Sequence, residues 1–228
     1  MSKVGHGYGS EWHLLRYLGW QRHELDRRVG HAIGGEVIEW LDFPFGAGKE
    51  SFYHAEWEGV DFLWVNHSAR KQWARRWPAG RTAPCWDAVG RVRVRGQEEW
   101  LLVEAKARTG EISAASKASD PRSLEQIGSL LNDAREACSI SAAHDWMGTC
   151  YQFCNRLAVL NFLTRHEVPA RLLFVYFIGD EFPTGSADCP QSEERWRVAL
   201  DEMHAKAGWP GDGRLQDRVH ELFLPMRG

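Results

Sequence analysis

Hydrophobic and polar residues alternate most regularly between Cys85 and Arg108, in two runs separated by a short polar turn at residues 95–97. A period of two is typical of strands, and a turn between two such runs predicts a β-hairpin. The second run contains the apolar segment Leu101–Val103, which indicates a strand buried on both faces. We expect the rest of the chain to be organised around this hairpin.

The N-terminal part of the chain has a helical period. We predict a helix from Glu11 to about Val29, with Ser10 as its N-cap. Because Glu11 continues the apolar stripe of this helix, its side chain is expected to point toward the core at the helix start. The apolar residues of the stripe are Leu14, Leu15, Leu18, Leu25 and Val29.

The remaining elements follow the same two periods. Strands are predicted at 36–45 and 171–178, and helices at 68–77, 122–137, 146–165, 192–207 and 214–224. The apolar run Arg171–Ile178 follows a helix closely, which implies a crossover back onto the sheet. We interpret residues 1–228 as one domain, with an inserted helix near 122–137 and C-terminal helices within 192–224.

Composition narrows the class of protein. The 228 residues are 43% hydrophobic and 26% charged, which is typical of a globular domain. A net charge of −3 argues against a tight, non-specific binder of nucleic acid. No run of eighteen apolar residues predicts a membrane span, and the polar N-terminus does not resemble a signal peptide. Five scattered cysteines fit reduced thiols, so we expect a cytoplasmic protein without membrane association.

Three charged residues are expected to converge at one end of the hairpin. Glu104 and Lys106 share a strand face, and Asp87 lies near the start of the preceding antiparallel strand. Two carboxylates and a lysine can hold a hard divalent cation and activate water against a phosphodiester. The alternative is a solvent-exposed hairpin with a surface ion pair between Glu104 and Lys106.

Asp87, followed after sixteen residues by Glu104-Ala105-Lys106, resembles the motif of the PD-(D/E)XK nuclease superfamily. Trp86 stands where the superfamily commonly has proline. The resemblance implies a restriction-endonuclease-like α/β fold, with a mixed central sheet flanked by helices. It also implies a metal-dependent phosphodiesterase that hydrolyses nucleic acid, with DNA as the expected substrate, and it makes a homodimer conceivable.

The resemblance also implies roles for single residues. Asp87, Glu104 and Glu11 would hold Mg²⁺ or Mn²⁺, since the first core helix of the superfamily often supplies an acidic residue. Lys106 would orient or deprotonate the attacking water, or stabilise the charge that develops on the phosphate. The alternative for Glu11 is a purely structural role, because a carboxylate in the first turn of a helix interacts favourably with the helix dipole.

Four further residues are candidates for contacts with nucleic acid. Arg91 and Arg93 follow Asp87 on the first strand of the hairpin, and Lys117 lies in a polar loop. Gln152 is suggested by the resemblance, because some branches of the superfamily place a Gln and a Tyr on the next helix. The usual Gln-x-x-x-Tyr spacing is absent here.

The predicted helix at 68–77 is basic and contains Trp73 and Trp77. Its charged residues could contact phosphates while the tryptophans stack on bases. We prefer the alternative, in which the charges face solvent and the tryptophans anchor the helix. The basic residues in and after this helix are Arg70, Lys71, Arg75, Arg76 and Arg81.

Two other hypotheses remain open. One is a non-catalytic member of the same fold that binds nucleic acid or protein, which the net acidity of the chain allows. The other is an unrelated α/β binding or scaffold protein whose Glu104 and Lys106 form a surface ion pair. Burial discriminates between these hypotheses: if Glu104 and Lys106 are exposed and distant from Asp87, the nuclease hypothesis fails.

Overall fold

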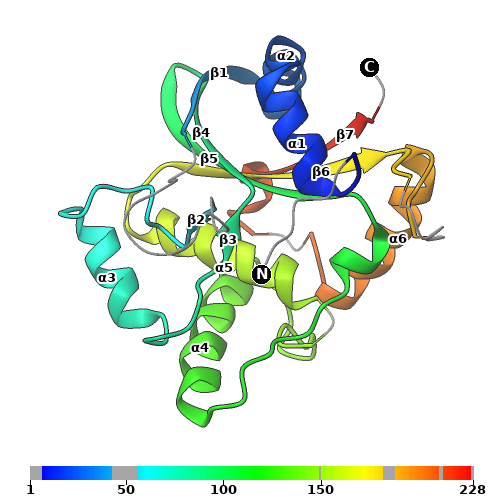
Figure 1. Cartoon of the computed structure of the whole chain (residues 1–228). Helices are drawn as coiled ribbons and strands as arrows, with labels where there is room; N and C mark the ends of the chain where they lie inside the picture. The colour runs from blue at the N-terminus through cyan, green and yellow to red at the C-terminus, as the bar shows by residue number, and fades with distance from the viewer. Residues whose placement is uncertain (1–6, 43–55, 149, 182–187, 211–212, 227–228) are drawn as a thin grey trace.

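The structure is a computed structural model that describes residues 7–42, 56–148, 150–181, 188–210 and 213–226. Its centre is a mixed five-stranded sheet in the order β1-β4-β5-β6-β7 (Figure 1). A separate two-stranded sheet pairs β2 with β3. The strands are β1 (Gly35–Trp40), β2 (Trp57–Glu58), β3 (Cys85–Trp86), β4 (Ala88–Val94), β5 (Gln97–Lys106), β6 (Ala170–Ile178) and β7 (Val219–Pro225).

Helices cover both faces of the large sheet. The N-terminal pair α1 and α2 lies on one face, and α4, α5 and α6 lie on the other, where they build the larger hydrophobic core (Figure 1). Within the described residues, no helix has the length and apolar character needed to cross a bilayer. The helices are α1 (Ser10–Gly19), α2 (Arg22–Ile33), α3 (Ser68–Arg76), η1 (Thr109–Ile112), α4 (Pro121–Ala137), α5 (Tyr151–Arg165), α6 (Glu193–Ala207) and η2 (Gln216–Arg218).

The predicted hairpin is confirmed as β4 and β5. Arg95 and Gly96 form its turn with φ angles of 51° and 80°, the positive values that tight two-residue hairpin turns require. The register pairs Ala88 with Val103 and ends at Val94 opposite Gln97. The residues from Leu101 to Ala105 are all buried, so the strand is covered on both faces as expected.

The predicted crossover is also confirmed. Helix α5 leads directly into β6, which runs parallel to β5 with Leu102 opposite Leu172. A parallel connection of this kind needs a helix-length return across one face of the sheet. Along the chain, α1 and α2 precede β1, and β2, α3 and β3 separate β1 from β4. Helices α4 and α5 connect β5 to β6, with α4 as the predicted additional helix.

The single N-terminal helix predicted from Glu11 to Val29 is wrong, because the chain forms two helices that meet at Trp20 and Gln21. The side chain of Arg22 donates to the carbonyl oxygen of Leu18 at 2.8 Å, which satisfies a helix-end acceptor. The apolar stripe consequently changes direction at the break. Leu15, which the continuous stripe placed in the core, is exposed.

The predicted C-terminal helix at 214–224 is also wrong. Its residues form η2 and then β7, which pairs in parallel with β6. Sheet pairing overrides the local helical spacing here, because β6 would otherwise present an open edge. The first C-terminal helix, predicted at 192–207, is confirmed as α6.

Two predicted boundaries need smaller corrections. Helix α5 begins at Tyr151 instead of Trp146, because the indole of Trp146 donates to the carbonyl oxygen of Ala207 at 2.8 Å and fixes this segment against α6. Strand β1 ends at Trp40, and residues 43–45 of the predicted strand lie outside the described residues.

A substitution at Leu173 tests how much the packing of the sheet contributes to stability, because the Leu173 side chain is fully buried on β6. Leu173→Ala should lower the free energy of unfolding by about 2–5 kcal/mol, measured by urea denaturation. Val198→Ala on α6 is the control, since Val198 is 63% exposed and its loss should change stability by less than about 0.5 kcal/mol. Equal losses in both variants would contradict this placement of the core.

Candidate functional site

Asp87 lies where the chain passes from the small sheet to the large one, between β3 and β4. Its backbone N–H donates to the carbonyl oxygen of Val103 at 3.0 Å. Its carboxylate Oδ2 accepts a hydrogen bond from the backbone N–H of Ala105 at 2.6 Å. These two bonds fix Asp87 beside the end of β5, where the hairpin pattern predicts it.

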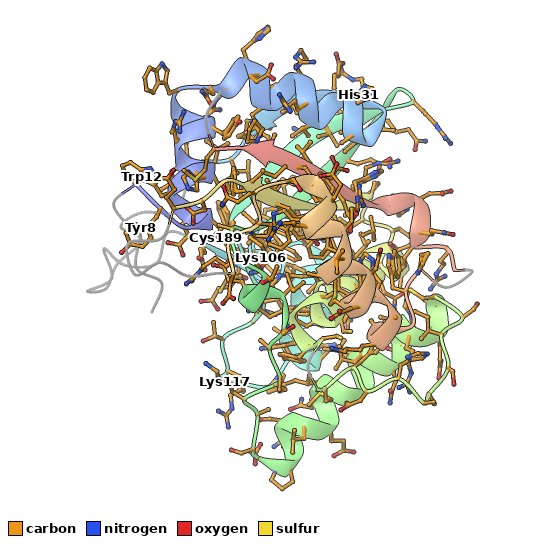
Figure 2. All side chains as sticks on the ribbon, turned by 90° about the vertical axis from the view of Figure 1, so that its right-hand side faces the viewer. Tyr8, Trp12, His31, Lys106, Lys117 and Cys189 are labelled. Atoms are coloured by element: carbon orange, nitrogen blue, oxygen red, sulfur yellow. The ribbon has the colours of Figure 1, made fainter. Side chains whose placement is uncertain are left out.

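Glu104 and Lys106 lie on the same face near the end of β5, as predicted. The ammonium group of Lys106 contacts Glu104 Oε1. The side chain of Lys106 is only 13% exposed, and that of Glu104 is only 5% exposed. The hypothesis of a surface ion pair on a solvated hairpin is therefore wrong; Figure 2 labels Lys106 near the middle of the view.

A second cation reaches Glu104 from the opposite side. Arg156 of α5 is buried and donates from Nε to Glu104 Oε2 at 2.7 Å. Its Nη2 donates to the carbonyl oxygen of Cys85 at 2.8 Å, and its guanidinium carbon lies 5.1 Å from the ring centroid of Trp86. Sequence reasoning missed Arg156. The available signal was its position as the one charged residue among residues 151–164.

The two cations determine the ionisation of this group. Burial acts to raise the pKa of Glu104, but Arg156 and Lys106 outweigh it and hold the pKa below its ordinary value. Burial acts to lower the pKa of Lys106, but Glu104 and then Asp87 outweigh it and raise the pKa. Lys106 is therefore an ammonium ion at neutral pH and a poor acceptor for a proton from water.

Asp87 also belongs to a cluster of three carboxylates. One oxygen from each of Glu11, Glu56 and Asp87 lies within 4.8 Å of the others, and all three residues are half-buried. Burial and then Glu104 raise the pKa of Asp87 to about 8, against the opposing effect of Lys106. Burial and then Glu56 raise the pKa of Glu11. Asp87 and Glu11 thus resist ionisation when no cation is bound.

Glu56 is the second functional candidate that sequence reasoning missed. It directly precedes β2, in which Trp57 pairs with Trp86 in antiparallel register. One further step along this register places Glu56 opposite Asp87. A two-residue strand leaves no periodic signal in the sequence, so this pairing could not be read from the pattern of residues.

Glu11 reaches the cluster because the start of α1 is tied to the far end of β6. Asp180, which is buried just after β6, contacts His13 Nε2 through Oδ1 at 2.9 Å. The backbone N–H of Gly9 donates to the other carboxylate oxygen of Asp180 at 3.1 Å. Because these contacts flank Glu11 on both sides, they position its side chain despite the helix break.

The chemistry of the donors fits a hard divalent cation. Oxygen ligands from carboxylates suit Mg²⁺ or Mn²⁺. A cation would stabilise the ionised form of Asp87, whose pKa is raised by burial and then by repulsion from Glu104. The expected ligand set of Asp87, Glu104 and Glu11 shares Asp87 and Glu11 with this cluster. Both carboxylate oxygens of Glu104 contact cationic side chains, and Glu56 is the third carboxylate in the cluster.

Arg91 and Arg93 do not join the site. They lie toward the turn of the hairpin, away from Asp87, and form exposed ion pairs that extend across β1, β4 and β5. The partners of these ion pairs are Glu36, Glu39 and Glu98.

The two remaining candidates for nucleic-acid contact differ in position. Lys117 is exposed on the connection between η1 and α4, and Figure 2 shows it apart from Lys106. Gln152 lies one helical turn before Arg156, on the same face of α5. Its buried Oε1 has no hydrogen-bond partner within the described part of the chain. Gln152 therefore remains a candidate beside the site.

No protein-family model, curated protein or solved structure matches this chain. The resemblance to the PD-(D/E)XK superfamily rests on the short motif and on the order of elements. Function must consequently be argued from the geometry and chemistry of the site itself.

Asp87→Asn should stabilise the metal-free protein at pH 8. An unfolded Asp releases its proton near pH 4, whereas folded Asp87 holds it until about pH 8. The folded state binds more protons between these values, so Asp87 makes stability fall as pH rises through this window. Urea denaturation in EDTA should give a gain of about 1 kcal/mol or more at pH 8 and none near pH 4. A pH-independent difference would contradict the raised pKa.

Mn²⁺ binding should depend on the carboxylate cluster of Glu11, Glu56 and Asp87. Glu56→Gln and Asp87→Asn should each weaken binding by about tenfold or more, measured by isothermal titration calorimetry. Glu24→Gln is the control, because Glu24 is an exposed carboxylate on α2 that pairs with Arg27. If Glu104→Gln abolished binding while Glu56→Gln left it unchanged, the set expected from the sequence would hold instead of this cluster.

Proposed function

We propose that this protein is a metal-dependent nuclease with a restriction-endonuclease-like fold, and that it hydrolyses phosphodiester bonds in DNA. The observation that carries the proposal is the convergence of Asp87, Glu104 and Lys106 at the buried end of the central hairpin. Glu11 and Glu56 extend this group on the side of Asp87.

The fold supports the proposal through its topology. The motif strand β5 lies in the middle of the sheet, antiparallel to β4 and parallel to β6. A helix precedes the first strand, and another connects β5 to β6. A mixed central sheet flanked by helices is what the resemblance implies, and most of its elements lie far from the motif in the sequence.

The energetics of the site support a functional role. Burying Glu104, Lys106 and Arg156 together costs free energy of desolvation that apolar residues of similar size would avoid. The pKa of Asp87 is raised to about 8, so ionising its carboxyl group in the folded protein lowers the free energy of unfolding. Groups with such perturbed ionisation gather at functional sites more often than in structural cores.

Each side chain has a defined role in this proposal. A divalent cation bound by Glu11, Glu56 and Asp87 would polarise a phosphate oxygen and favour ionisation of water. Lys106 carries a positive charge at neutral pH, so it stabilises negative charge developing on the phosphate instead of removing a proton. Glu104 holds Lys106 in place, and Arg156 keeps Glu104 ionised.

One observation favours a second candidate function. Arg156 and Lys106 together contact both oxygens of Glu104, as if side-chain cations occupied the place of a metal ion. A non-catalytic member of the same fold, which binds nucleic acid or protein, would have this arrangement permanently. The two candidates differ in whether the site hydrolyses DNA.

The decisive experiment is cleavage of linear, circular and single-stranded DNA in the presence of Mg²⁺ or Mn²⁺. The wild-type protein should cut at least one of these, and EDTA should abolish cutting. Asp87→Asn and Lys106→Met should each lower the rate by about a hundredfold or more. Lys206→Ala should leave it unchanged, because Lys206 is an exposed lysine on α6.

The outcome separates the two candidates. Cutting that survives in both site variants would identify a contaminating nuclease and contradict the proposal. If the protein cut no DNA but bound Mn²⁺ through Asp87, the metal site would stand and DNA would be the wrong substrate. Absence of both would favour the non-catalytic function.

A further inference from the structure

A loop between β2 and α3 presents two large apolar side chains to solvent. Trp64 and Val65 are 74% and 72% exposed, although neighbouring Phe62 and Leu63 are buried in the core. Most tryptophans in a folded domain bury much of their surface, so an exposed indole at a loop tip indicates a contact surface.

This loop is held firmly in place. Arg70 of α3 donates from Nη1 to the carbonyl oxygens of Leu63 at 2.7 Å and Asp61 at 3.0 Å. The indole of Trp64 lies against the ring of His67, with centroids 5.8 Å apart. Trp64 is therefore presented in a defined position at the start of α3, which reduces the entropy lost when it binds a partner.

A row of positive charge continues from Trp64 along α3. Lys71 and Arg75 are four residues apart, which places them on one face of the helix. Lys71 and Arg75 are exposed, and neither forms an ion pair with any residue that the structure describes. The segment 61–81 contains five basic residues and one acidic residue, although the whole chain has a net charge of −3.

The other tryptophans of this region serve the core. Trp73 is buried, packs edge-on against Phe162 at 5.0 Å and stacks on Trp77 at 5.3 Å. The anchoring role preferred for them from the sequence is thus confirmed for Trp73. The aromatic group that faces solvent beside the basic row is Trp64, which the sequence analysis did not single out.

We infer that Trp64, Lys71 and Arg75 form a binding surface for single-stranded nucleic acid. Lys71 and Arg75 neutralise successive phosphates, and Trp64 stacks on a base. The base must be unpaired, because the faces of bases inside a duplex are covered by their neighbours. The combination of an aromatic platform and a basic row is the usual composition of single-strand binding surfaces.

The surface is connected to the candidate site through the small β2–β3 sheet. Trp64 follows Glu56 by eight residues, a distance that a fully extended chain spans in about 28 Å. Figure 1 shows α3 on the side of β2 and β3, away from α6. The backbone of Trp64 therefore lies no more than about 28 Å from that of Glu56, a member of the carboxylate cluster. The inference rests on the proposed nuclease function for its biological meaning, although binding itself needs no cleavage.

The test measures binding without cleavage. Fluorescence anisotropy in EDTA would compare a labelled single-stranded oligonucleotide with its duplex, using the Asp87→Asn protein as parent. The parent should prefer the single strand. Adding Trp64→Ala should weaken single-strand binding by about fivefold or more and leave duplex binding nearly unchanged. Trp20→Ala is the matched control, because Trp20 is 83% exposed at the junction of α1 and α2.

The two basic residues have a separate signature. Replacing both Lys71 and Arg75 by alanine should reduce the slope of log K against log salt by about 1.4 for single strands, since each phosphate contact contributes about 0.7. Trp64→Ala should leave this slope unchanged, because stacking releases few counterions. Lys206→Ala should also leave it unchanged, because Lys206 lies on α6.

Two outcomes would overturn the inference. Single-strand affinity that is equal in the parent and Trp64→Ala would exclude stacking, whatever the cleavage assay gives. A parent that binds neither strand form would exclude nucleic acid and redirect Trp64 and Val65 to a protein contact. Conversely, binding that depends on Trp64 in a protein that cuts nothing would keep this surface and reject the proposed nuclease function.

Discussion

The pairing of the buried Glu104 carboxylate with two cationic side chains is the interaction on which the rest of the structure depends. Lys106 contacts it from the same strand, and Arg156 contacts it from α5 while also binding the backbone of β3 at Cys85. Removing one partner of a buried ion pair leaves an uncompensated charge and commonly costs about 3–5 kcal/mol. The packing of α5 on the sheet, the position of β3 and the charge of Lys106 are therefore coupled through one side chain.

How much of this architecture the sequence predicts depends on the range of the interactions. The hairpin turn at Arg95 and Gly96 and the apolar run of β6 are local patterns, and both are confirmed. Strand β7 was missed because its pairing with β6 is a tertiary effect that overrides helical spacing. The break between α1 and α2 was missed because Leu18 and Leu25, on its two sides, are seven residues apart, a spacing that fits one continuous helix.

The candidate site divides in the same way. Asp87, Glu104 and Lys106 could be predicted because one hairpin brings them together, and alternation along a strand determines which side chains share a face. Glu56 and Arg156 could not, since they reach the site through a two-residue strand and a crossover helix. Charged residues in apolar segments, such as Arg156 in α5, are nevertheless a signal that can be sought in other chains.

The tie between α1 and Asp180 has a consequence for the order in which the protein is made. His13 and Asp180 are separated by 167 positions, so the anchor that positions Glu11 forms only after most of the chain has left the ribosome. The hairpin with Asp87 and Glu104 is synthesised much earlier. A nascent chain therefore carries the motif before it can complete the carboxylate cluster, which assembles as a late step of biosynthesis.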